Sequence, residues 1–333
     1  MPSTPKNFLT MLDMVTESAE DFAVPQSLGV AEATHVQRVR TIFDDPNIVG
    51  AGVAEKWSDG APSGVLSLCF YVKKKIPKER VKAANMLPPV MAAPNGAAIF
   101  TDVVEIGKVV PQLTLPLVRR KPIQSGYSVG HFAITAGTLG AIVTRGGKKY
   151  LLSNSHVLAD SGQGKPGDAI YYPGKFDGGG KPDTIAKLAF FEPFTVSTSF
   201  VNEIDAALAE VLVDRLQQVN YAIYGAKTPI KTLDPQRDMK IVVMGRTSGK
   251  KKSIVRDVDF RILTDYDVGT VGFKGQVLAD VYSAGGDSGS IIIDDASGAI
   301  VGLHFAGSPK GSIFTPIRKV MAALKFSFAA GRK

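Results

Sequence analysis

Short apolar runs alternate with glycine-rich segments along the chain from about residue 125 to residue 315. Frequent turn signals between short apolar runs are typical of an all-β fold. The stretch 316–325 differs, because its apolar residues recur at the spacing of one helix face. We therefore predict a mainly β unit that ends in a C-terminal helix.

The first 120 residues follow another pattern, in which helical spacing comes before strand-like runs. The predicted helices cover 6–22, 31–45 and 77–84, and the predicted strands cover 48–55, 65–73 and 98–104. Pro77 suits the first turn of its helix. Prolines and the basic run 119–121 interrupt 109–125, which we interpret as a linker. Residues 1–120 are thus expected to form a small α/β domain with leading helices.

Composition places the chain among soluble globular proteins, with 44% hydrophobic and 21% charged residues. No apolar run approaches the about 18 residues that span a bilayer, so no membrane association is expected. The start lacks the pattern of a secretory leader, and the one cysteine, Cys69, excludes an internal disulfide. We therefore predict a cytoplasmic protein in which Cys69, inside an apolar run, is a buried residue rather than a nucleophile.

The net charge of +8 and the run Lys250-Lys251-Lys252 raise nucleic-acid binding as an alternative function. The sequence contains no nucleic-acid motif and no aromatic residues interleaved with the lysines, which favours a solvated hairpin tip. The glycine run 178–180 before Lys181 lacks the strand–loop–helix spacing of a phosphate-binding loop. We predict no metal and no cofactor.

The most informative stretch is Gly286-Asp287-Ser288-Gly289. A serine between glycines forms a sharp turn that presents a hydroxyl and frees backbone N–H groups. The N–H groups of Gly286 and Ser288 would then converge on an oxyanion. The same residue types also form ordinary turns, so this motif alone leaves both interpretations open.

A nucleophilic serine needs a base and a group that orients the base. Of the four histidines, His156 alone ends an apolar strand (150–155) and opens a helical bend, whereas His35 suits a solvated helix and His131 a turn. Asp205 begins the apolar run 204–211, where a half-buried carboxylate needs a hydrogen-bonding partner. The other aspartates that precede it, Asp160, Asp168, Asp177 and Asp183, lie in segments typical of solvated loops.

These three segments together resemble trypsin-like serine peptidases of the chymotrypsin fold. The stretch 153–158 reads S-N-S-H-V-L, 204–209 reads I-D-A-A-L-A, and 286–290 reads G-D-S-G-S, in the order of that family. Two further boxes, A-G-T-L-G at 136–140 and G-R-T-S-G at 245–249, are similar to a branch that includes bacterial proteins and plant proteases of the narrow-leaf type.

The resemblance implies two six-stranded barrels, at about 125–216 and about 238–315, in a protease domain of residues 121–333 that closes with the helix 316–325. It implies Ser288 as nucleophile, His156 as general base and then acid, Asp205 as the orienting carboxylate, and the N–H groups of Gly286 and Ser288 as the oxyanion hole. In secreted relatives a newly cut N-terminus pairs with the aspartate before the nucleophile, here Asp287.

Two residues bear on specificity. The family position at the base of the substrate pocket is Tyr282, so the acid that selects Lys or Arg is missing. The segment 302–307, G-L-H-F-A-G, resembles the pocket wall of picornavirus-type proteases, which implies that His304 donates a hydrogen bond to a Gln or Glu side chain of the substrate. A histidine bonded to the backbone is the alternative.

The sequence therefore predicts a serine endopeptidase that cleaves protein or peptide substrates through an acyl-enzyme. The alternatives are a catalytically silent trypsin-like interaction module and a basic nucleic-acid-binding protein. We expect the N-terminal domain, 1–120, to bind a regulatory partner or to assist folding.

Overall fold

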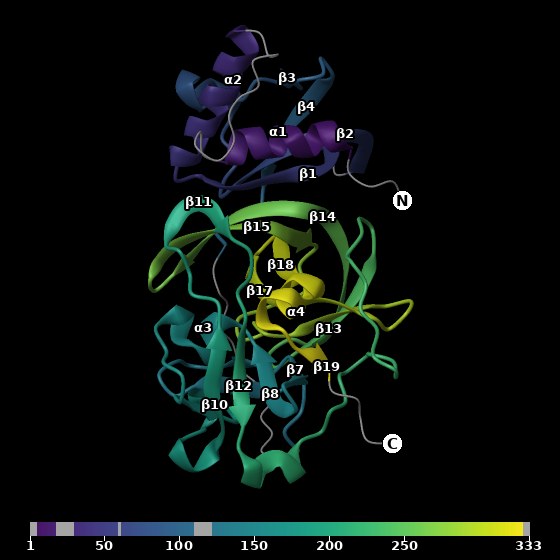
Figure 1. Cartoon of the computed structure of the whole chain (residues 1–333). Coiled ribbons are helices and arrows are strands. Elements are labelled where there is room, and N and C mark those ends of the chain that lie inside the picture. The colour runs from purple at the N-terminus through teal and green to yellow at the C-terminus, as the bar shows by residue number, and fades with distance from the viewer. Residues whose placement is uncertain (1–4, 18–29, 59–60, 110–121, 329–333) are drawn as a thin grey trace.

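The computed structural model describes residues 5–17, 30–58, 61–109 and 122–328. Most of the linker expected at 109–125 lies outside these residues. The fold is mainly β, as predicted, with two β-units below a small α/β unit (Figure 1).

The first β-unit is a curled sheet that carries His156 and Asp205. Its order is β19-β7-β8-β12-β10-β9-β5-β6. Its strands are β5 (Ser128–His131), β6 (Gly137–Thr138), β7 (Ala141–Arg145), β8 (Lys148–Ser153), β9 (Ala169–Tyr171), β10 (Thr184–Phe191), β12 (Ala207–Val211) and β19 (Ser327–Phe328). Apolar side chains such as Val129, Leu151 and Ile170 fill its interior because alternate strand residues point inward.

The second β-unit is a closed barrel that carries Ser288. Pairings run from β13 through β14, β15, β18, β17 and β16 and back to β13. The strands are β13 (Lys240–Gly245), β14 (Gly249–Tyr266), β15 (Gly269–Ala279), β16 (Ile291–Asp294), β17 (Ile300–Ser308) and β18 (Gly311–Pro316); β11 (Ser197–Asn202) is added alongside β15. The amphipathic helix α4 (Ile317–Leu324) follows β18 and buries Ile317, Val320 and Leu324.

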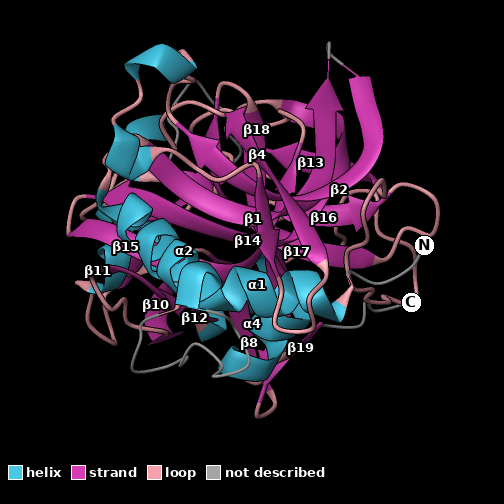
Figure 2. Ribbon diagram, turned by 90° about the horizontal axis from the view of Figure 1, so that it is seen from above, coloured by secondary structure: helices cyan, strands magenta, loops and turns pink. Residues whose placement is uncertain are grey.

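The N-terminal unit packs two helices, α1 (Lys6–Thr16) and α2 (Val30–Thr41), on a four-stranded sheet. Figure 2 shows both helices lying across these strands. The strands are β1 (Ile48–Ser58), β2 (Ala61–Val72), β3 (Val90–Ala92) and β4 (Ala98–Glu105), and β2 and β4 are parallel.

The helix predicted at 77–84 is wrong. Two single 3₁₀ turns, Lys78–Arg80 and Ala83–Asn85, occupy this segment, and neither buries a residue. A helix in a protein is stabilised mainly by docking an apolar face, and this charged segment has none to dock.

The N-terminal unit and the second barrel share one sheet. Strand β1 pairs antiparallel with β14, with Gly50 opposite Ile262 and Ala51 opposite Arg261. A Cβ atom on Gly50 would lie 2.0 Å from the carbonyl oxygen of Arg261, so glycine is needed for this close approach. Arg261 also forms ion pairs with Asp13 and Glu17 at the end of α1.

No helix within the described ranges is both long and apolar enough to cross a bilayer. Cys69 is fully buried, as predicted, and burial raises the pKa of its thiol.

Candidate active site

His156 and Asp205 lie side by side in the first β-unit. Strand β8 ends at Ser153, and the chain turns at once into the short helix α3 (Ser155–Leu158), which carries His156. Asp205 comes two residues before β12, the neighbour of β8. The Nδ1 atom of His156 is 2.5 Å from Oδ2 of Asp205. This contact fixes one tautomer, because Nδ1 must carry the proton that the carboxylate accepts.

The Asp205 carboxylate is completely buried and accepts three further hydrogen bonds. The backbone N–H groups of Ser155 and His156 donate to Oδ1, at 2.7 Å and 3.2 Å. The phenol of Tyr266 donates to Oδ2 at 2.9 Å. A buried charge needs such partners, because desolvation is otherwise unfavourable by several kcal/mol.

Tyr266 is a residue that the sequence reasoning missed. It ends β14 in the second barrel, and burial raises the pKa of its phenol well above the ordinary value. The hydroxyl therefore keeps its proton and acts as a donor. A signal was present in the sequence, because Phe260, Ile262, Thr264 and Tyr266 repeat with period two on the buried face of one strand.

Ser288 lies in the loop between β15 and β16 and is 4% exposed. Its Oγ donates to the carbonyl oxygen of Phe305 at 3.3 Å, and no hydrogen bond within the described ranges joins it to His156. The two segments are nevertheless neighbours, since a Cβ atom on Gly137 would meet both Val157 and the Ser288 carbonyl oxygen. In this structure the hydroxyl is thus bonded within its own barrel, next to the segment that carries His156.

Two threonines from other segments hydrogen-bond to the loop that carries Ser288. Thr138 Oγ1 donates to the Gly286 carbonyl at 2.7 Å, and the Thr138 N–H donates to the Ser288 carbonyl at 2.7 Å. Thr247 Oγ1 donates to the Gly285 carbonyl at 2.7 Å. These threonines belong to the A-G-T-L-G and G-R-T-S-G boxes, which gives both boxes a physical role.

Asp287 is satisfied by three backbone donors. Its Oδ1 accepts from the N–H groups of Thr247 (2.9 Å) and Ser248 (3.0 Å), and its Oδ2 accepts from Ala284 (2.9 Å). Only 1% of the residue is exposed. The carboxylate is thus held by backbone donors from residues 247–248 and from Ala284 in its own loop.

A buried ion pair lies behind the same loop. The guanidinium of Arg246 donates to both carboxylate oxygens of Asp177, at 2.9 Å and 2.8 Å, and both side chains are fully buried. The loop around Asp177 is exposed, as its glycine-rich composition indicated, but the Asp177 side chain itself is buried against Arg246. Gly286 adopts φ +90°, and a Cβ atom there would lie 1.9 Å from Nη1 of Arg246. Glycine at this position leaves room for the guanidinium.

The loop leaves two N–H groups available. Among the hydrogen bonds of residues 122–328, none is donated by the backbone N–H of Gly286 or of Ser288. Two such donors on one turn are what an oxyanion requires.

Tyr282 and His304 contact each other beneath this loop. The Tyr282 hydroxyl lies 2.9 Å from Nδ1 of His304, which is also 2.9 Å from the Ile313 carbonyl. Both residues are nearly fully buried. Burial lowers the pKa of His304 to about 4, so the ring is neutral at neutral pH. No group within the described ranges bonds its other ring nitrogen, Nε2.

A second histidine–aspartate pair, His131 with Asp168, lies apart from His156 and Asp205 and shares no hydrogen bond with them. His131 lies in β5 rather than in a turn, is 2% exposed, and bonds Asp168 at 3.0 Å through Nε2. Within the described part of the chain, no cluster of three or more His, Cys, Asp or Glu residues is arranged to hold a metal ion.

Comparison with protein-family models and with curated proteins found no match. Among solved structures, the chain is similar to Thermobifida fusca protease A, with TM-score 0.46 and 16% identity over 63% of this chain and 99% of that one. It is also similar to a glutamic-acid-specific serine protease (TM-score 0.44, 15% identity) and to Cellulomonas bogoriensis chymotrypsin (0.43, 14%), each over 62% of this chain and 99% and 98% of theirs.

Proposed function

We propose that this protein is a serine endopeptidase that hydrolyses peptide bonds through an acyl-enzyme. The observation that carries the proposal is the His156–Asp205 contact beside a Ser288 loop in which two N–H groups have no partner among the described residues. Ser288 is the proposed nucleophile, His156 the base, and Asp205 the group that orients the base.

The reaction follows from these positions. Ser288 Oγ bonds to the carbonyl carbon while its proton passes to Nε2 of His156, and the carbonyl electrons move to the oxygen. The N–H groups of Gly286 and Ser288 stabilise that oxyanion. The C–N bond then breaks, and the imidazolium gives its proton to the leaving amine. Water repeats the sequence on the acyl-enzyme, releases the acid and restores Ser288.

Labelling with a fluorophosphonate probe tests this proposal. We expect the wild type to be labelled on Ser288 and Ser288→Ala to lose both labelling and peptide cleavage. His156→Ala should lower both by a factor of at least about 10³, because the hydroxyl loses its base. Ser199→Ala, which removes an exposed hydroxyl, is the matched control and should behave as the wild type. A folded wild type that neither labels nor cleaves would favour the silent interaction module instead.

We further propose that His304 selects glutamine at the position before the cleaved bond. The Ile313 carbonyl oxygen, 2.9 Å from Nδ1, can only accept a hydrogen bond, so Nδ1 carries the proton of the neutral ring and Nε2 is left to accept from the side-chain N–H of a glutamine. A neutral imidazole offers no counter-charge to an ionised glutamate, so Gln is preferred over Glu. Profiling a peptide library with the wild type, His304→Ala and Tyr282→Phe tests this. An unchanged preference in His304→Ala would reject the role.

A further inference from the structure

We propose that Tyr266 is a positioning residue for the His156–Asp205 pair and that the N-terminal unit holds Tyr266 in place. This inference rests on the proposed peptidase function. The N-terminal unit is then a structural part of the catalytic machinery rather than an appended domain.

Tyr266 acts on the same carboxylate oxygen as His156. Its hydroxyl lies 2.9 Å from Oδ2 of Asp205, and Nδ1 of His156 lies 2.5 Å from that atom. The two rings are neighbours as well, with centroids 5.7 Å apart. A second donor on Oδ2 fixes the plane of the carboxylate and disperses its charge. The direction in which Asp205 faces His156 therefore depends on the position of the phenol.

Strand β14 brings Tyr266 across from the second barrel. Tyr266 is the last residue of β14, four residues beyond Ile262, which pairs with Gly50 of β1. On its other edge this part of β14 pairs with β15, where Tyr266 is opposite Gly269. Strand β1 thus pairs with the edge of β14 that the barrel itself leaves open, four residues before Tyr266.

The N-terminal unit and Tyr266 also share a hydrophobic core. Val49 and Tyr71 of the N-terminal unit belong to the same buried cluster as Tyr266 and Phe305. Phe305 supplies the carbonyl that accepts from Ser288, so this cluster extends to the nucleophile. Because the side chains of a protein interior leave few voids between them, a small displacement of Val49 or Tyr71 is passed on to Tyr266 through this cluster.

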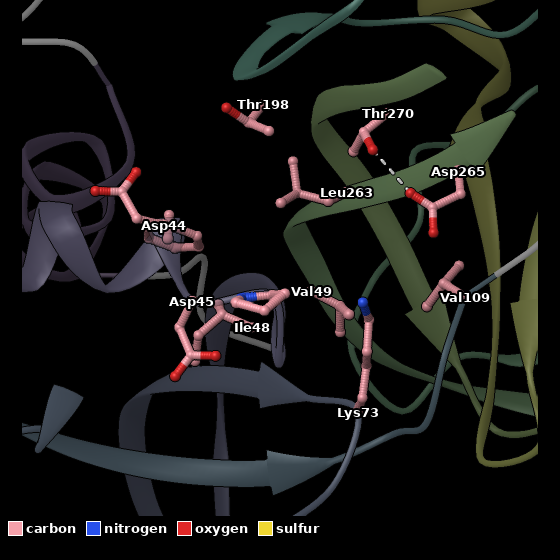
Figure 3. Close-up of a pocket in the computed structure, with 12 residues that line it drawn as sticks. Asp44, Asp45, Ile48, Val49, Lys73, Val109, Thr198, Leu263, Asp265 and Thr270 are labelled. Carbon is pink, nitrogen blue, oxygen red and sulfur yellow. Dashed lines mark hydrogen bonds between the residues drawn. The ribbon is translucent and has the colours of Figure 1, made fainter. Parts of the chain in front are cut away.

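Figure 3 shows the junction from the side of a pocket of about 340 Å³. Val49 and Lys73 of the N-terminal unit face Leu263, Asp265 and Thr270 of the β14–β15 hairpin. Asp265, the neighbour of Tyr266, accepts from Thr270 at 2.9 Å. It also pairs with Lys108, which follows β4, at 3.3 Å. The hairpin end that carries Tyr266 is therefore tied to the N-terminal unit by pairing, packing and charge.

Two substitutions in the full-length protein test the two halves of this inference. Tyr266→Phe removes only the hydroxyl, and Gly50→Ala places a Cβ atom against the Arg261 carbonyl and separates β1 from β14. Each should lower kcat about tenfold with little change in KM, because a hydrogen bond to a charged group is lost or lengthened. The double variant should lose no more than the stronger single one, since both act through the same contact.

Two control variants and a pH profile distinguish a loss of His156–Asp205 positioning from a general loss of stability. Tyr224→Phe removes a hydroxyl from a tyrosine that is 40% exposed, and Gly180→Ala adds a Cβ atom where the nearest group is Pro182 at 3.8 Å. Both should match the wild type. In Tyr266→Phe and Gly50→Ala, the acidic limb of the kcat/KM profile should move to higher pH, because a less shielded carboxylate stabilises imidazolium. A lower melting temperature with an unmoved limb would overturn the positioning role.

A spectroscopic readout does not depend on turnover. In ¹⁵N-labelled Ser288→Ala protein, the low-field proton of His156 Nδ1–H reports its bond to Asp205, and we expect Tyr266→Phe and Gly50→Ala to shift this signal alike. If Gly50→Ala does not fold, Val49→Ala, which removes packing from the shared cluster, should shift it in the same direction and less. An unchanged signal in Tyr266→Phe overturns the inference. Absent cleavage by the wild type together with a shifted signal overturns the proposed function alone.

Discussion

Asp205 and Asp257 are both completely buried, and each accepts a hydrogen bond from a tyrosine, but they lie in different surroundings. Asp205, at the candidate active site, has four donors, of which one is the His156 ring. Asp257, on β14 at the junction with the N-terminal unit, has two, the Tyr71 hydroxyl at 3.1 Å and the Asp259 N–H at 2.9 Å. Burial raises the pKa of Asp257 to about 7.

The difference shows that burial alone does not give a carboxyl group a chemical role. Asp257 lies against the backbone of β1, where a Cβ atom on Gly52 would be 2.0 Å from its Oδ2, and no base within the described ranges is hydrogen-bonded to it. Asp205 has enough donors to satisfy a charge and directs one oxygen at an imidazole. The number of donors and the presence of a base therefore distinguish a proposed catalytic carboxylate from a structural one.

The largest expected effect comes from removing the charge at Asp205. Asp205→Asn should lower kcat by about 10⁴-fold, because the amide favours the wrong tautomer of His156. Asp257→Asn, at the other buried site, should leave kcat within about twofold of the wild type, since the amide keeps the size of the carboxyl and can still accept from Tyr71, so that the junction of β1 with β14 stays in place. Steady-state kinetics on one peptide substrate measures both. Equal losses in the two variants would remove the distinction between the sites.

A third buried carboxyl group, that of Asp177, extends the comparison, because its partner is the positively charged guanidinium of Arg246. Asp177→Asn leaves the Arg246 guanidinium buried without its counter-ion, and we expect the free energy of unfolding to fall by about 3–5 kcal/mol. Asp234→Asn breaks the exposed pair with Arg318 and should change stability by less than about 1 kcal/mol. Urea unfolding measures both variants. Comparable losses would contradict the role of burial.

The contribution of Asp257 to stability can be measured from the pH dependence of the free energy of unfolding. Its pKa is raised on folding from an ordinary value near 4, so its contribution is fully present below about pH 4 and is lost as pH rises through about 7. The wild type should therefore lose stability, on the order of a few kcal/mol, between pH 4 and pH 8 through this group. Asp257→Asn should flatten that part of the curve. Urea unfolding of both proteins across this range tests the prediction, and parallel curves would contradict it.

The smallest expected effect is that of Tyr71→Phe. The Tyr71 hydroxyl lowers the pKa of Asp257 by donating to its charged form, so removing it leaves that form less stable. Stability should fall by about 1–2 kcal/mol at pH 8, and less at pH 5, where the carboxyl is protonated. The same unfolding series measures it. A loss that is equal at both pH values would indicate lost packing instead.

Local pattern was sufficient for several parts of the molecule. An apolar run ending in small polar residues located His156, and an acid at the start of an apolar strand located Asp205. Strand-like runs at 48–55, 65–73 and 98–104 correspond to β1, β2 and β4. These features are encoded within a few neighbouring residues, because strand periodicity and turn composition act locally. The prediction of a helix at 77–84 was wrong. The segment has helical spacing but no apolar face that could pack against the rest of the protein.

Local sequence patterns could not predict the contacts between segments that are far apart in the chain. Asp177 is 69 positions from Arg246, and Tyr266 is 61 from Asp205, so neither partnership has a local signature. The sequence by itself determined local elements such as β1, β2, β4 and α4 and showed which side chains are chemically suited to their places. Tertiary structure alone decided that β1 lies beside β14, that the phenol of Tyr266 reaches Asp205, and that Asp257 is left with two donors. The physical reason is that hydrogen bonding and burial depend on which segments meet, whereas propensity depends on neighbours along the chain.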